Sequence, residues 1–137
     1  MYAGSGLVRF EYKNFAVIGP ESIRAADAAA CANKQGQFWP YHDTLFANQR
    51  GENQGAFRDD TLQAFAAALG LDEAAFNACL DSGRYRDEVQ AETAAGQERG
   101  VRSTPTLFIN GEKVEGAIPF DQLQPMIEAA LANATSE

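Results

Sequence analysis

Apolar residues recur with two different periods along this chain, and each period predicts a different kind of element. In residues 7–13 every second residue is apolar, which is typical of a half-buried strand with Val8, Phe10 and Tyr12 on one face. From residue 21 to residue 100 the apolar spacing is three or four, which predicts a block of helices. The order strand, helices, hairpin and helix predicts an α/β sandwich with an inserted helical block.

Capping residues and glycines indicate where the helices begin and end. Pro20 opens an alanine-rich helix that Gly36 stops, and Asp60 and Asp72 are expected to cap two later helices. Between them a short aromatic helix begins near Phe38. We expect its aromatic residues to lie in the core of the helical block, namely Phe38, Trp39, Tyr41 and Phe46.

The last part of the chain, residues 104–133, reads as a proline loop, a hairpin and a helix. Pro105 directly precedes a short apolar strand, a position that tolerates a residue without a ladder donor. Asn110-Gly111 supplies the positive φ values of a two-residue turn. In the following helix Pro125 is expected in the first turn or at a kink.

Composition excludes several classes of partner. The 137 residues are expected to form one domain, and their net charge of -8 disfavours binding to a nucleic-acid backbone. No apolar run is long enough for a membrane span, and the first residues are too polar for a signal peptide. His42 is the only histidine, so we expect no metal site, no cofactor and no catalytic triad.

The two cysteines, Cys31 and Cys79, are too far apart in the sequence for a Cys-x-x-Cys motif. They leave three interpretations open: a structural disulfide, two buried thiols, or a redox pair. Both are expected late in their helices, where the helix dipole disfavours a thiolate, so they are poor candidates for a nucleophile. We therefore expect no catalytic residue in this chain.

Four segments together resemble the DsbA-like branch of the thioredoxin-fold oxidoreductases. They are Gln35-Gly36-Gln37-Phe38-Trp39, Tyr41-His42-Asp43 with Leu45-Phe46, Leu80-Asp81-Ser82-Gly83-Arg84-Tyr85, and the hairpin that follows Thr104-Pro105. The resemblance implies a thioredoxin-like fold and, in a longer parent protein, thiol-disulfide exchange on extracytoplasmic protein or peptide substrates. It implies that Thr104 and Pro105 form a cis-proline loop that binds substrate, the alternative being a trans proline that only begins a strand.

The same resemblance implies that the family's first strand and its Cys-x-x-Cys helix precede residue 7, and this chain lacks both. We therefore expect a truncated, redox-inactive domain, with a natural relative that lost its redox pair as the alternative. To fill the resulting gap in the sheet, residues 7–13 are expected to pair antiparallel with the Thr106 strand, or a homodimer is expected to form by strand exchange.

Two other functions compete with the oxidoreductase reading. One is a peptide-binding module without enzymatic activity, which would accept an extended peptide beside Thr104 and Pro105. The other is a glutathione-using relative, for which Ser5 is the only candidate hydroxyl near the start of the chain.

Overall fold

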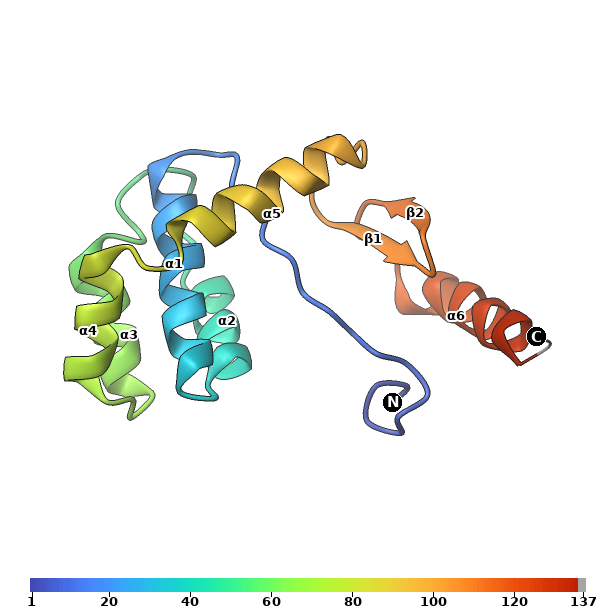
Figure 1. Cartoon of the computed structure of the whole chain (residues 1–137), viewed down its shortest axis with the longest axis horizontal. Coiled ribbons are helices and arrows are strands. Elements are labelled where there is room, and N and C mark those ends of the chain that lie inside the picture. Colours follow the sequence, from blue (N-terminus) through green and yellow to red (C-terminus); the bar gives the residue numbers. More distant parts are fainter. Residues whose placement is uncertain (136–137) are drawn as a thin grey trace. The chain divides into compact units, whose positions relative to one another are not determined.

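A computed structural model describes residues 1–135 of the chain. Its helices and strands follow the order expected for residues 20–134 (Figure 1). The elements are α1 (Pro20–Lys34), α2 (Phe38–Ala47), α3 (Asp59–Ala68), α4 (Glu73–Ser82), α5 (Arg86–Glu98), β1 (Thr106–Ile109), β2 (Glu112–Glu115) and α6 (Phe120–Ala134).

The elements form two compact units, where the sequence predicts a single domain over residues 1–137. One unit contains residues 13–95, and the other contains residues 1–12 together with the chain from residue 96 onward. The boundary falls inside α5. Residues 136 and 137, which the predicted domain includes, lie outside the described part of the chain.

The helical unit is built around α1, which packs against α2, α3 and α4. The buried side of α1 consists largely of alanines, and these small side chains let the neighbouring helices approach closely. The larger buried residues come from the other helices and from the turn before α4: Tyr41, Leu45, Leu62, Leu71, Phe76 and Leu80. The buried hydroxyl of Tyr41 donates a hydrogen bond to the Leu62 carbonyl at 2.8 Å, so this polar group has a partner in the core.

The caps are partly as the sequence predicts. Asp72 caps α4, because its side chain accepts a hydrogen bond from the Ala75 N–H at 3.0 Å. The expected cap at Asp60 is wrong: α3 begins one residue earlier, at Asp59, and Arg58 occupies the cap position without a side-chain bond. The acidic pair at the start of α3 instead lies at the positive end of the helix dipole.

The aromatic residues of α2 divide between the core and the surface. Tyr41 is fully buried and Phe38 is partly buried against the core, as expected. Trp39 and Phe46, however, are 47% and 57% exposed, so their assignment to the core is wrong. The rings of both residues contact the ring of His42.

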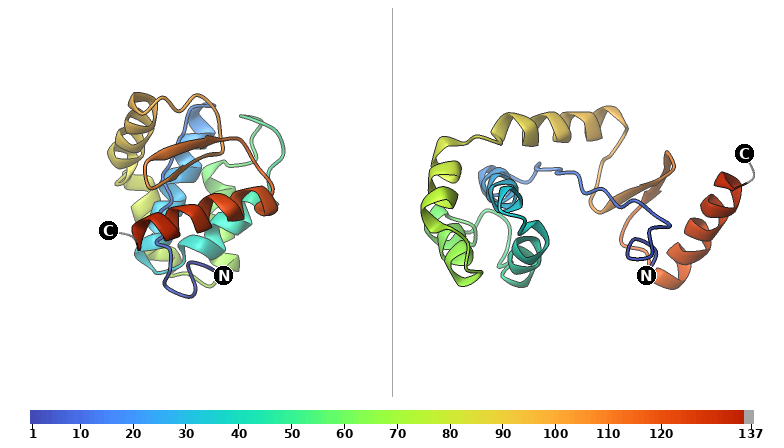
Figure 2. Two further views of the ribbon diagram at one scale, coloured as in Figure 1. Left: turned by 90° about the vertical axis from the view of Figure 1, so that its right-hand side faces the viewer. Right: turned by 60° about the horizontal axis from the view of Figure 1, so that its bottom comes forward.

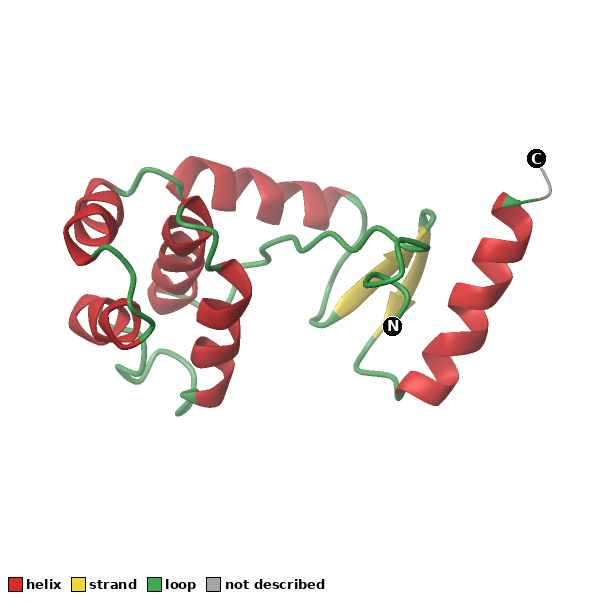
Figure 3. Cartoon of the chain, turned by 90° about the horizontal axis from the view of Figure 1, so that it is seen from below, coloured by secondary structure: helices red, strands yellow, loops and turns green. Residues whose placement is uncertain are grey.

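The second unit contains the hairpin and α6, which run alongside each other (Figures 2 and 3). β1 and β2 pair antiparallel around the Asn110-Gly111 turn, and both turn residues have positive φ values as predicted. In α6, Pro125 lies in the second helical turn rather than the first. Residues 1–7 fold back on themselves, and the Tyr2 hydroxyl donates to Glu128 of α6 at 2.7 Å.

Residues 7–13 do not form the predicted strand. A strand needs a ladder partner, and among residues 1–135 the sheet contains only β1 and β2. The expected antiparallel pairing of residues 7–13 with the Thr106 strand is therefore wrong. Just beyond this segment the N–H of Asn14 and that of Ala16 donate to Glu92 and Thr93 of α5.

Candidate functional site

The edge of β1 that faces away from β2 carries main-chain groups without a partner in the described residues. The Gly116 N–H donates to the Pro105 carbonyl at 2.9 Å, so these two residues form a hydrogen-bonded pair of the hairpin. In an antiparallel hairpin, hydrogen-bonded residue pairs alternate with pairs that are not hydrogen-bonded. Leu107 and Ile109 therefore bond to β2, whereas Thr106 and Phe108 are in non-bonded pairs. The N–H and C=O groups of Thr106 and Phe108 thus point outward, and we call them the β1 edge.

The loop that leads into this edge contains the two predicted substrate-binding residues. The Thr104–Pro105 peptide bond is cis, and both residues are exposed. The hydroxyl of Thr106 donates to the Ser103 carbonyl at 2.7 Å and closes the loop. An extended segment that approached the loop would therefore meet Thr104 first and the β1 edge next.

One face of the hairpin carries a cluster of charged side chains around an aromatic ring. Alternation along the strands places Thr106, Phe108, Lys113 and Glu115 on this side, which we call the Phe108 face. The guanidinium of Arg99 lies 3.7 Å from the centroid of the Phe108 ring, a cation–π contact. The opposite face carries Leu107, Ile109 and Val114, all half-buried.

Lys113 and Glu115 form an ion pair on the Phe108 face, at 2.7 Å. The hydrogen bond from Lys113 and the positive charge of Lys113 lower the pKa of the Glu115 carboxyl, and the charge of Arg102 lowers this pKa further. Lys113 also donates to the Gly100 carbonyl at 3.1 Å. In the described residues neither Arg99 nor Arg102 forms a salt bridge.

Cys31 and Cys79 form a disulfide that joins α1 to α4, with their Cα atoms 5.9 Å apart. Of the three interpretations, the structure therefore contains a bridge rather than two free thiols. Cys31 is 2% exposed and is shielded from an external thiolate, whereas Cys79 is half-buried. Because these are the only two cysteines, the chain has no free thiol.

The other residues considered from the sequence do not converge on a reactive centre. His42 lies 3.0 Å from the neighbouring Asp43 and contacts the rings of Trp39 and Phe46. The Ser5 hydroxyl donates within its own turn, to the Tyr2 carbonyl. In the described part of the chain no cluster of histidine, cysteine or acidic residues could hold a metal ion, and no helix could span a membrane.

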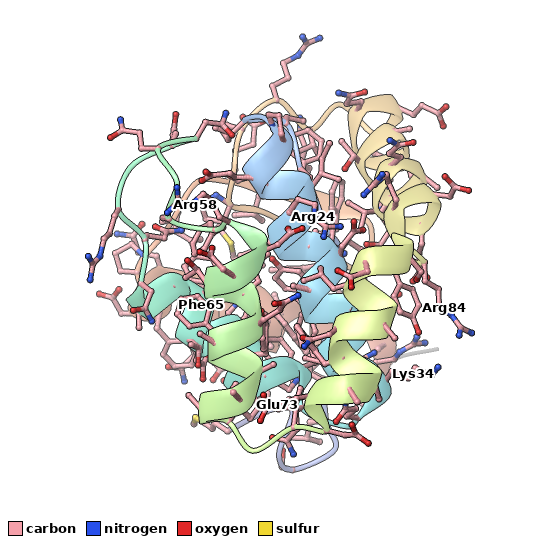
Figure 4. All side chains as sticks on the ribbon, turned by 90° about the vertical axis from the view of Figure 1, so that its left-hand side faces the viewer. Arg24, Lys34, Arg58, Phe65, Glu73 and Arg84 are labelled. Atoms are coloured by element: carbon pink, nitrogen blue, oxygen red, sulfur yellow. A yellow bond between two sulfur atoms is a disulfide. The ribbon has the colours of Figure 1, made fainter. Side chains whose placement is uncertain are left out.

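Sequence reasoning missed one buried charge cluster, centred on Asp27 of α1. Its carboxylate is 1% exposed and lies 3.6 Å from both Arg24 and Arg86. Arg24 also donates to both oxygens of Asp59 at 2.8 Å and to the Leu80 carbonyl at the end of α4. Figure 4 shows Arg24 on α1, with α3 on one side and α4 on the other. No local pattern in an alanine-rich helix signals that its aspartate is buried.

The two aspartates of this cluster have opposite pKa shifts. Burial raises the pKa of Asp27, and the charges of Arg86 and Arg24 offset only part of that effect. The hydrogen bonds from Arg24 lower the pKa of Asp59, whose side chain is half-exposed. The cluster ties α1, α3, α4 and α5 together, and we assign it a structural role.

The fold and this site place the chain in a known class. A family model described as thioredoxin matches residues 1–129, so the chain belongs to the thioredoxin family. The crystal structure of oxidised BdbD from Bacillus subtilis superposes with a TM-score of 0.77 at 23% identity, over 88% of this chain and 66% of that one. The thioredoxin-like, DsbA-like fold predicted from the sequence is thus confirmed.

Curated relatives fall into two groups. The chain is 35% identical over 112 residues to a Na(+)/H(+) antiporter NhaA of Herminiimonas arsenicoxydans, covering 82% of this chain but 17% of that protein. It is 23% identical over 133 residues to disulfide bond formation protein D of Bacillus subtilis, covering 95% of this chain and 60% of that protein. The chain therefore spans less than two thirds of either relative.

Proposed function

We propose that this chain is the substrate-docking part of a DsbA-like thiol-disulfide oxidoreductase domain, which acts in protein disulfide formation within a longer parent protein. The observation that carries the proposal is the exposed Thr104–Pro105 loop that leads into β1. An extended substrate segment pairs with main-chain groups of such a loop through hydrogen bonds. Thr104 and Pro105 are the substrate-binding residues of this proposal.

The chemistry of the proposed reaction needs groups that this chain does not contain. In protein disulfide formation a substrate thiolate attacks an oxidised dithiol motif and forms a mixed disulfide. A second substrate thiolate then attacks that mixed disulfide, so the substrate leaves oxidised and the motif leaves as two thiols. Both cysteines here are bonded to each other across α1 and α4, and Cys31 is buried. In this proposal the chain by itself is redox-inactive, and the dithiol belongs to the rest of the parent.

The Cys31–Cys79 bridge supports an extracytoplasmic location for the parent. Disulfides persist in oxidising compartments and are rare in the cytosol, where thiols are kept reduced. An extracytoplasmic domain would meet proteins that are still acquiring their disulfides. Such proteins expose extended cysteine-bearing segments, which are the substrates that we propose for the Thr104–Pro105 loop.

A second candidate is a peptide-binding module without enzymatic activity. The absence of any free thiol favours it, because binding beside the Thr104–Pro105 loop needs main-chain groups only. In this case the parent would hold extended segments without oxidising them. The two candidates share the Thr104–Pro105 loop and differ in whether the parent supplies a dithiol.

Docking beside the Thr104–Pro105 loop can be tested with peptides that differ only in backbone methylation. Methyl groups on the amide nitrogens of alternate residues block one edge of an extended peptide and leave the other free. We expect the full chain to bind two such peptides unequally in fluorescence anisotropy, because only one of them can still pair through its favoured edge. Equal binding of both peptides, or no binding of an unmethylated parent peptide, would overturn the proposal.

A further inference from the structure

Residues 1–7 have the backbone geometry of a helix C-terminus. The Gly6 N–H donates to the Ala3 carbonyl at 3.2 Å, and the Leu7 N–H donates to the Tyr2 carbonyl at the same distance of 3.2 Å. Gly6 itself has a φ of 76°, in the left-handed region. Two such bonds around a left-handed glycine form the Schellman motif, with which α-helices commonly end.

The turn before Gly6 also contains a helical hydrogen bond. The Ser5 N–H donates to the Met1 carbonyl at 3.1 Å, which is the bond from residue i to residue i−4 that defines an α-helix. A single turn of this kind is unstable in isolation, because helix nucleation fixes several residues for one hydrogen bond. A contact outside the turn is therefore needed to stabilise it.

Tyr2 supplies this contact by binding to α6, and Figure 2 shows the first residues of the chain next to that helix. The Tyr2 hydroxyl donates to Oε1 of Glu128 at 2.7 Å, and the same oxygen accepts a bond from Gln124 at 2.8 Å. The Tyr2 ring lies 6.5 Å from the ring of Phe120, between centroids. Because Phe120, Gln124 and Glu128 are four positions apart, they form one row along α6.

Beside this row α6 carries an apolar stripe, which consists of Phe120, Leu123, Ile127 and Leu131. No residue of α6 is buried, and Phe120 is 52% exposed. The main-chain groups of α6 bond within the helix, so the stripe is covered by side-chain packing and not by strand pairing. In a helix that ended at Ser5, the residues three, four and seven positions before Tyr2 would face α6 together with it.

We propose that residues 1–5 are the last turn of a longer amphipathic helix, that this helix packs on the apolar stripe of α6, and that Tyr2 and Glu128 position it. The inference rests on one part of the proposed function, the longer parent protein, and not on substrate docking. Continuity favours this occupant over a second copy of the chain. A helix that runs directly into Met1 is already held beside α6, whereas a second copy loses translational and rotational freedom on binding.

The test extends the full chain at its N-terminus by about three helical turns of alanine, leucine, glutamate and lysine. In the matched extension the leucines stand three, four, seven and eleven places before Tyr2, on the same face of the helix. In the rotated extension, of equal composition, they stand two, five, six and nine places before Tyr2, on the opposite face. NMR measures amide hydrogen exchange in both extensions, with the amides of Leu107 and Ile109 in the hairpin as the internal reference.

We expect the matched extension to exchange at least about ten times more slowly than the rotated one, because only the matched leucines are buried against α6. Tyr2→Phe keeps the ring and removes the hydroxyl, so exchange in the matched extension should become about two to five times faster. Glu128→Ala removes the acceptor and should have a similar effect. Tyr85→Phe removes a hydroxyl from the helical unit and should leave the exchange unchanged.

The outcomes separate this inference from the proposed function. Equal exchange in the two extensions would overturn the packing on α6, whatever the peptide-binding test shows. Slow exchange that neither Tyr2→Phe nor Glu128→Ala accelerates would overturn the positioning role of these residues. Sedimentation velocity on the same samples covers the remaining occupant: a stable dimer with either extension would assign the stripe to a second copy and contradict the proposal.

Discussion

Asp27 and Asp59 share Arg24 as a partner, yet they affect stability in opposite directions. Asp27 is buried with both carboxylate oxygens unmatched by a hydrogen bond, and its folded-state pKa is raised. Its contribution to stability is therefore greatest below its unfolded pKa, about 3.9, and is lost as pH rises through the folded-state value. Asp59 has a lowered pKa, so its contribution is present at neutral pH and is lost on acidification.

This contrast predicts different pH profiles for Asp27→Asn and Asp59→Asn. Between about pH 3 and 7, the free energy of unfolding of the wild type should fall relative to Asp27→Asn and rise relative to Asp59→Asn. The neutral-pH loss in Asp59→Asn should be about 1 kcal/mol, since its carboxylate is half-exposed. Urea unfolding at a series of pH values measures both differences. Parallel pH profiles for the two variants would contradict the assigned pKa directions.

The burial and the contacts of single side chains are the hardest features to predict from the sequence. Thr104 and Pro105 stood out because a proline before a short apolar strand has few structural explanations. Asp27 did not, because one of its charged partners, Arg86, lies far along the chain on α5. Trp39 and Phe46 were misplaced for a related reason: their spacing on α2 does not show how much of the helix its neighbours cover.

At the scale of elements, the Cys31–Cys79 disulfide cross-links α1 to α4. The bridge closes a loop with a sequence separation of 48, which in the chain-entropy treatment stabilises the folded state by about 4 kcal/mol. We expect Cys31→Ser with Cys79→Ser to lower the free energy of unfolding by roughly that amount. Urea unfolding with and without dithiothreitol measures it, and the reductant should have no effect on the double variant. A loss below about 1 kcal/mol would show that the bridge adds little to the packing of α1 on α4.

The elements themselves were predictable wherever their stabilising contacts are local. Helical periodicity and caps such as Asp72 located the helices, and Asn110-Gly111 located the hairpin. Residues 7–13 show the limit of such reasoning. Their alternation is typical of a strand, but a strand forms only beside a partner, and the structure offers none in residues 1–135.

At the scale of the whole molecule, the chain combines a helical unit with a unit that contains the hairpin, and its two cysteines are bonded to each other. The helical unit has its own buried core and its own disulfide. The hairpin unit presents the Thr104–Pro105 loop and the β1 edge. The chain belongs to the thioredoxin family, and we propose that it depends on the rest of its parent for redox chemistry.

The most direct test of this account is the catalysed reduction of insulin disulfides by dithiothreitol, followed by turbidity. We predict that the full chain accelerates the reaction no more than the Cys31→Ser, Cys79→Ser variant does, with both at the level of buffer alone. Turnover by the wild type that the double variant lacks would make Cys31 and Cys79 a redox pair, and would contradict the claim that this chain docks substrate without oxidising or reducing it.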